Sequence, residues 1–109
     1  MIPQQVKREL LDCLKDSKLH RIILFGSYAD QCEHPESDID LLIVSEIEVV
    51  NKTYESHLKH KNAISRKLIP LKKRYPIDII VYTKDEWKLL NAYNTSFIKA
   101  ISERGIDLL

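Results

Sequence analysis

Apolar residues recur along this chain at two spacings, and each spacing predicts a different kind of element. Where they return every three or four positions, the pattern predicts helices: Pro3–Lys18, about Val49–Ile69 ended by Pro70, and two short helices within Asp85–Leu109 that break near Asn94-Thr95 and end at Gly105. Where they form short unbroken runs, it predicts buried strands: Ile22–Phe25, Asp38–Ser45 and Ile77–Thr83. The polar segment Tyr28–Ser37 is expected to be a loop, or a short helix followed by a turn.

The resulting order of elements, α-β-β-α-β-α-α, predicts one domain of the α/β (α+β) class over residues 1–109. We expect a small mixed sheet with few, central strands and with helices covering at least one of its faces. The pattern leaves the relative direction of the first two strands open.

Composition excludes several classes of protein. The formal net charge of +1 predicts no bulk attraction to nucleic acid or to an anionic membrane. Two glycines are too few for a Walker A loop or a Rossmann fingerprint, and two cysteines (Cys13 and Cys32) cannot make a disulfide framework or a four-cysteine zinc site. The longest apolar runs, Ile22–Phe25 and Leu41–Val44, are far too short to span a membrane, and the N-terminus lacks the apolar core of a signal peptide. We therefore expect a cytoplasmic protein with reduced cysteines.

Three aspartates stand where strands normally exclude them. Asp38 and Asp40 directly precede the apolar run Leu41–Val44, and Asp78 interrupts the third predicted strand. Because side chains alternate along a strand, Asp38 and Asp40 are expected on one face, roughly 6–7 Å apart, with a repulsion on the order of 2–3 kcal/mol. A divalent cation would convert that repulsion into attraction, and Mg²⁺ prefers such oxygen ligands. With Asp78 on the same face, the three carboxylates predict a two-metal site.

Each aspartate alone has an ordinary structural explanation. Asp38 could cap the start of a strand, Asp40 could lie on a solvated edge, and Asp78 could pair with a lysine. The Gly26-Ser27 pair that closes the first strand shifts the balance, because glycine lets the backbone approach a ligand and the serine hydroxyl with its neighbouring amides can hold phosphate oxygens.

The spacing of these residues resembles a known family. Gly26-Ser27, ten intervening residues and Asp38-Ile39-Asp40 reproduce the GSx10DxD pattern of the DNA polymerase β-like nucleotidyltransferase superfamily. The short chain is similar to the minimal nucleotidyltransferases (MNT), which are antitoxin partners of HEPN-domain ribonuclease toxins. The resemblance covers about Ile22 to Thr83 and implies the nucleotidyltransferase fold.

The resemblance also implies a mechanism. Asp38 and Asp40 would ligate two Mg²⁺ ions, Asp78 would complete the shell of one ion and help to activate the acceptor hydroxyl, and Gly26 and Ser27 would hold the β- and γ-phosphates of ATP. The acceptor attacks the α-phosphorus, pyrophosphate leaves, and AMP remains on the acceptor. This mechanism is positioning plus charge neutralisation.

One part of the motif departs from the family. Many relatives read Gly-Ser-x-Ala-Arg-Gly, whereas Asp30 and Gln31 stand here at the arginine and second glycine positions. Losing a cation near the triphosphate is expected to weaken nucleotide affinity, while the metal ligands are unchanged.

The resemblance implies that the chain is an enzyme that neutralises a HEPN toxin by transferring AMP to it, as in type VII-like toxin–antitoxin pairs. We expect a hetero-oligomer with that toxin, with a homodimer as the alternative. Two other functions remain: a transferase acting on a small molecule such as an aminoglycoside, and a non-catalytic antitoxin that blocks its toxin by binding.

Weaker patterns have simpler explanations. His57 and His60 share a helix but have no evident third ligand for zinc. The basic stretch between Lys59 and Arg74 is expected to be a solvated face. A set of terminal apolar residues is expected to pack the last helices onto the sheet or to form part of a protein interface: Trp87, Tyr93, Phe97, Ile98 and Ile101.

Overall fold

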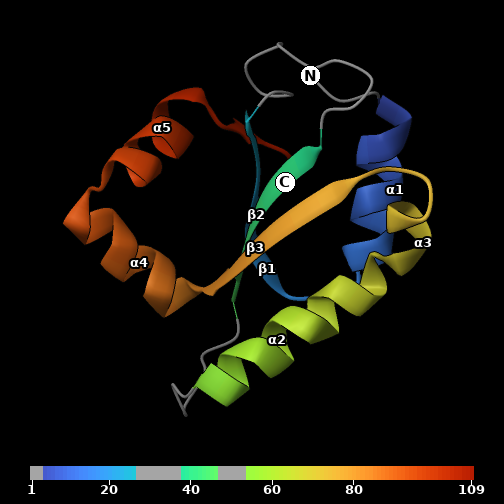
Figure 1. Cartoon of the computed structure of the whole chain (residues 1–109), viewed down its shortest axis with the longest axis horizontal. Helices are drawn as coiled ribbons and strands as arrows, with labels where there is room; N and C mark the ends of the chain where they lie inside the picture. The colour runs from blue at the N-terminus through green and yellow to red at the C-terminus, as the bar shows by residue number, and fades with distance from the viewer. Residues whose placement is uncertain (1–3, 27–37, 47–53) are drawn as a thin grey trace.

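A computed structural model describes residues 4–26, 38–46 and 54–109. Its elements, coloured along the chain in Figure 1, are α1 (Gln4–Leu14), β1 (Leu19–Phe25), β2 (Ile39–Ser45), α2 (Tyr54–Lys67), α3 (Ile69–Lys72), β3 (Ile77–Thr83), α4 (Lys84–Tyr93), α5 (Ser96–Arg104) and β4 (Ile106–Asp107). The predicted helices and strands are therefore present, with β4 and α3 in addition. No helix in the described ranges is long and apolar enough to cross a membrane.

The sheet has four strands in the order β3-β2-β1-β4. β1 runs antiparallel to β2 and β4, whereas β2 and β3 run parallel, so the sheet is mixed, as predicted. The antiparallel pairing settles the direction that the sequence left open: β1 ends at the edge of the sheet where β2 and β3 begin.

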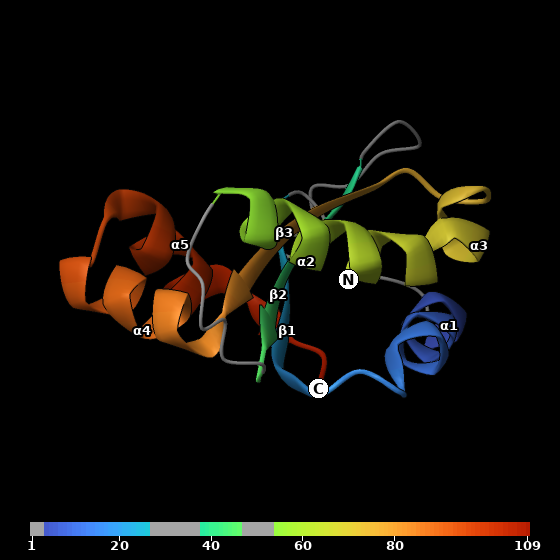
Figure 2. The same ribbon diagram turned by 90° about the horizontal axis from the view of Figure 1, so that it is seen from below.

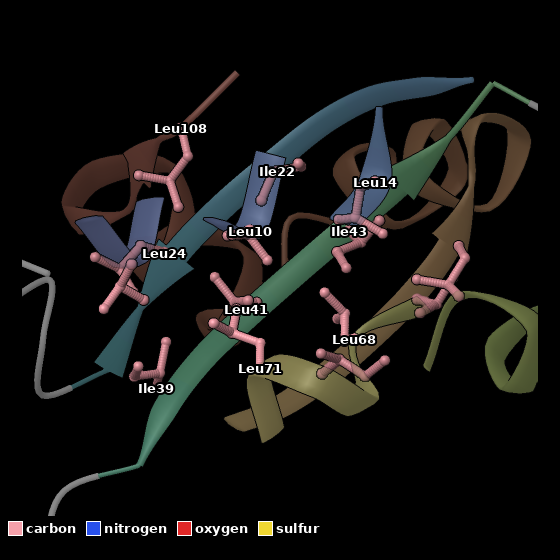
Figure 3. Close-up of a cluster of buried hydrophobic side chains, with 14 residues drawn as sticks. Leu10, Leu14, Ile22, Leu24, Ile39, Leu41, Ile43, Leu68, Leu71 and Leu108 are labelled. Carbon is pink, nitrogen blue, oxygen red and sulfur yellow. The ribbon is translucent and has the colours of Figure 1, made fainter. Parts of the chain in front are cut away.

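Helices cover both faces of this sheet. Figures 1 and 2 show α1, α2 and α3 on one side and α4 and α5 on the other. The first layer seals a large apolar cluster, shown in Figure 3, around the inward residues of β2. These residues are Ile39, Leu41 and Ile43, each at most 2% exposed. The second layer seals a smaller cluster against Leu42 and Val44, in which Trp87, Ile98 and Ile101 are buried.

Two helix boundaries differ from the prediction. The first helix ends at Leu14 and not at Lys18, because Leu14 is its last buried position and the chain then turns, with the Ser17 amide donating to the Leu14 carbonyl. Pro70 does not end the helical segment, since it stands in the first turn of α3, where a missing N–H costs little. Leu71, 1% exposed, holds this short helix against the large cluster.

The C-terminal helices are separated by capping residues. Asn94 ends α4 in the left-handed conformation (φ 51°), and the Thr95 hydroxyl accepts a bond from the Ile98 amide to begin α5, which confirms the predicted break. Gly105 follows α5 as predicted, but its backbone is extended (φ −67°, ψ 150°). Its lack of a side chain is required by space, because a Cβ there would lie 2.5 Å from the Ile101 carbonyl oxygen and 2.6 Å from Ile23.

Candidate active site

The pairing of β2 with β3 brings two of the three singled-out aspartates together. Asp40 and Asp78 are direct partners in the parallel register, so their side chains lie on the same face of the sheet. Asp38 directly precedes β2 at the same edge. Asp38 and Asp78 are exposed and Asp40 is partly buried. The placement of Asp78 beside Asp40, expected from the sequence, is confirmed.

Gly26 lies against the Asp40 carboxylate. Its backbone has φ +75°, in the left-handed region that glycine adopts without strain. A Cβ built on Gly26 would lie 2.3 Å from Asp40 Oδ2, a separation that no side chain at this position could keep. The backbone at Gly26, at the end of β1, therefore lies directly against the Asp40 carboxylate.

The electrostatics of the site centre on Asp40. Burial raises the pKa of the Asp40 carboxyl above its ordinary value, and the negative charges of Asp78 and Asp38 raise it further. No salt bridge or side-chain hydrogen bond engages any of the three aspartates within residues 4–26, 38–46 and 54–109. Pairing of Asp78 with a lysine is thus not seen in those ranges.

The donor set suits a hard divalent cation only in part. Asp40 and Asp78 present oxygen ligands in register, and the repulsion on Asp40 is what a bound cation would relieve. As the side chains stand, no group of three or more His, Cys, Asp or Glu residues in the described segments is arranged to hold a metal ion. The side chain of His57, which the sequence pairs with His60 without a third ligand, lies outside the described part of the chain.

Several predicted residues lie outside the described part of the chain. These are Ser27, the segment Tyr28–Ser37 with Asp30 and Gln31, and Cys32. Cys13 packs against the large cluster, as predicted for a core thiol.

The basic stretch at the end of α2 has structural contacts. Lys67 Nζ donates to Ser17 Oγ at 2.6 Å, and the Arg74 guanidinium pairs with Glu9 of α1 while lying 5.6 Å from the Tyr75 ring centre. Lys67 also lines a cavity of about 420 Å³ with Ser45 and Leu19, at the end of the sheet away from the aspartates. These cations help to hold α1 against α2 and α3.

One feature of the site was not anticipated from sequence. Phe25, the Cα partner of Asp40 across β1 and β2, packs edge-to-face against Phe97 of α5, with ring centres 5.8 Å apart. The sequence assigned Phe97 only to packing or to an interface. Its position directly before the buried residues Ile98 and Ile101 gave no signal that it reaches the end of β1.

Comparison with known proteins adds a family to this geometry. Residues 8–105 match the family described as Polymerase beta, Nucleotidyltransferase. A protein of Methanocaldococcus jannaschii named as a protein adenylyltransferase, MJ0141, is 35% identical over 114 aligned positions, covering 98% of this chain and 95% of that protein.

Solved structures share the fold. A toxin–antitoxin structure with AMP-PNP aligns over 94% of this chain and 72% of its own, with a TM-score of 0.51 and 21% identity. A mutant toxin–antitoxin complex, MntA-HpeT, aligns over 94% and 71%, with a TM-score of 0.55 and 19% identity. At these identities the likeness establishes the fold.

Proposed function

Since this chain belongs to the polymerase β nucleotidyltransferase family, we propose that it transfers AMP from ATP to a protein acceptor in a magnesium-dependent reaction. The observation that carries the proposal is the in-register Asp40–Asp78 pair beside Gly26. The relative named as a protein adenylyltransferase supports a protein acceptor, because the alignment covers nearly the whole of both chains. We treat residues 1–109 as one nucleotidyltransferase domain.

The acceptor we propose is a partner toxin of the HEPN ribonuclease class. Two neighbours in fold are toxin–antitoxin complexes, and one of them was solved with an ATP analogue. The GSx10DxD spacing supports the same assignment. The protein would then be the antitoxin, forming a hetero-oligomer with its toxin.

Each residue of the site has a proposed task. Asp38 and Asp40 would hold two Mg²⁺ ions, with Asp78 completing the shell, and the ions would neutralise charge on the triphosphate. Gly26 leaves room at the end of β1 for phosphate oxygens, and Ser27 would donate its hydroxyl to them. Asp78 would draw the proton from the acceptor hydroxyl. The acceptor oxygen forms a bond to the α-phosphorus as the bond to the bridging oxygen breaks, and pyrophosphate leaves with that oxygen.

Intact-protein mass spectrometry tests the proposal. The protein and whatever co-purifies with it from the native host are weighed before and after addition of Mg-ATP. We expect an AMP-sized increment on the partner, which an Asp38→Asn, Asp40→Asn double variant should fail to add. Asp12→Asn, a change of one exposed aspartate on α1, is the matched control and should leave the increment intact.

Other outcomes would redirect the assignment. A stable partner that gains no mass would indicate an antitoxin that acts by binding. AMP transfer to an aminoglycoside or similar small molecule, without any protein partner, would indicate the small-molecule transferase.

A further inference from the structure

An aromatic side chain stands directly beside the candidate site. Phe25 is the last residue of β1, adjacent to Gly26, and it is the Cα partner of Asp40 in the antiparallel register. Directly opposite residues of an antiparallel pair place their side chains on the same face, with Cβ atoms roughly 4.5–5.5 Å apart. The ring of Phe25 therefore borders the carboxylate on the side away from Asp78.

A second ring extends this aromatic surface to the solvent. Phe97, in the first turn of α5, meets Phe25 at an interplanar angle of 89° and remains 41% exposed. Its helix is anchored by the Thr95 cap and by Ile98, which is 2% exposed in the smaller cluster. A large ring held on a rigid element, with part of its surface open, is suited to stacking.

The chemistry of the site indicates which substrate lies on this side. In an in-line displacement, the attacking and leaving oxygens lie on opposite sides of the α-phosphorus. Asp78, the proposed proton acceptor, is on β3, whereas Gly26 and Phe25 end β1 on the other side of Asp40. The acceptor therefore approaches from β3, and pyrophosphate leaves toward Gly26 at the end of β1. The nucleoside stays on the α-phosphorus beside Asp40, and the aromatic surface that borders Asp40 is formed by Phe25 and Phe97.

We infer that Phe97, supported from behind by Phe25, is the stacking platform for the nucleobase of ATP. The inference rests on the proposed nucleotidyl transfer and adds the binding element for the part of the donor that the aspartates and Gly26 leave unbound. Because every base has a π-face, stacking of this kind tolerates different bases.

Calorimetric titration with two magnesium-bound ligands tests this role: ATP, and inorganic tripolyphosphate, which lacks the base. We expect Phe97→Ala to raise the Kd for ATP about tenfold while leaving the Kd for tripolyphosphate unchanged. Phe97→Tyr should restore ATP binding. Leu89→Ala removes another large exposed apolar side chain, 58% exposed on α4, and should change neither Kd.

Three outcomes would overturn the inference. Equal weakening of ATP and tripolyphosphate would mean that Phe97 only supports the turn at Gly26, and unchanged ATP binding would remove Phe97 from the site. Wild-type protein that binds neither ligand would overturn the proposed function together with the platform. If Phe97→Ala fails to fold, Phe97→Leu keeps an apolar side chain without the ring and should show the same selective loss.

Discussion

The two faces of the sheet are built from the same strands but serve different ends. On the face under α1, α2 and α3, β2 presents the apolar side chains of Ile39, Leu41 and Ile43, and fourteen buried residues of the described segments form one cluster. On the face under α4 and α5, only six residues are fully buried in the cluster, and the row that contains Leu42 and Val44 begins with Asp40. The first face contributes most of the buried apolar surface that stabilises the fold. The second face buries less apolar surface, because Asp40 and Asp78 occupy one end of it.

The separation of apolar and charged side chains onto two faces explains how the fold tolerates the repulsion between Asp40 and its neighbouring aspartates. A buried or crowded carboxylate disfavours its own charged form, and the cost must be offset elsewhere. The alternation of side chains along β2 lets Ile39 and Leu41 pack tightly on one face while Asp40, between them, points to the other. Adjacent residues of one strand can thus be changed separately to test the two roles.

The largest expected effect is on the apolar face. Leu41→Ala should lower the free energy of unfolding by about 4 kcal/mol, because a fully buried leucine leaves a cavity in a well-packed cluster. Leu42→Ala, its equally buried neighbour on the other face, should cost about 2 kcal/mol, since the smaller cluster can collapse more readily. Urea unfolding of both variants measures the difference. A larger loss for Leu42→Ala would reverse the assignment of the stabilising face.

The second prediction concerns the charged face. Asp40→Asn should reduce AMP transfer at least about a hundredfold, since a proposed metal ligand becomes a neutral amide of similar shape. Initial rates of transfer to the acceptor, measured beside Asp12→Asn as the control, give this number. A variant retaining most of its rate would show that Asp40 is not a ligand in the reaction.

Much of this division could be predicted from sequence. The apolar runs identified β1, β2 and β3, and the misplaced aspartates identified the acidic residues of the candidate site. The same alternation that puts Asp38 and Asp40 on one face leaves Ile39, Leu41 and Ile43 for the opposite face, where they are buried. These features are local: they depend on periodicity within single elements.

The features that the sequence did not predict depend on contacts between segments that are far apart in the chain. β4 is two residues long, and Ile106 is held by pairing with Leu24, so no periodicity in its own sequence could reveal it. The contact of Phe97 with Phe25 joins residues 72 positions apart. Similarly, Pro70 could not be read as a helix start without knowing that Leu71 is buried in the large cluster.

The third prediction compares the two glycines. Gly26→Ala should lower the free energy of unfolding by about 1–2 kcal/mol, because the left-handed backbone disfavours a Cβ, and it should also reduce transfer by pushing against Asp40. Gly105→Ala should lower stability by about 1–3 kcal/mol through its clash with Ile101 and Ile23, yet preserve the rate of transfer in the folded fraction. Thermal melts and rates of both variants provide the test. Equal rates for the two would mean that Gly26 serves the fold alone.

The smallest expected effect is the pH dependence of stability. The pKa of Asp40 is raised in the folded state, so the native protein binds more protons than the unfolded chain between the ordinary pKa of 3.8 and the raised value. The stability that Asp40 contributes is therefore fully present below about pH 3.8 and is lost as the pH rises through the folded-state pKa. At neutral pH, Asp40→Asn should be more stable than the wild type, by a margin that solvent screening keeps small and that closes in acid. Urea unfolding from about pH 4 to pH 8 measures it.

Adding Mg²⁺ to the same urea unfolding experiment provides a further comparison of the wild type with Asp40→Asn. At neutral pH, added Mg²⁺ should stabilise the wild type, because an ion that binds only the folded state shifts the equilibrium toward it, and should leave Asp40→Asn unchanged. Chelation should reverse the gain. If the wild type is the more stable protein at neutral pH without magnesium, the carboxylates do not repel one another in the fold. The charged face would then carry no strain for a cation to relieve.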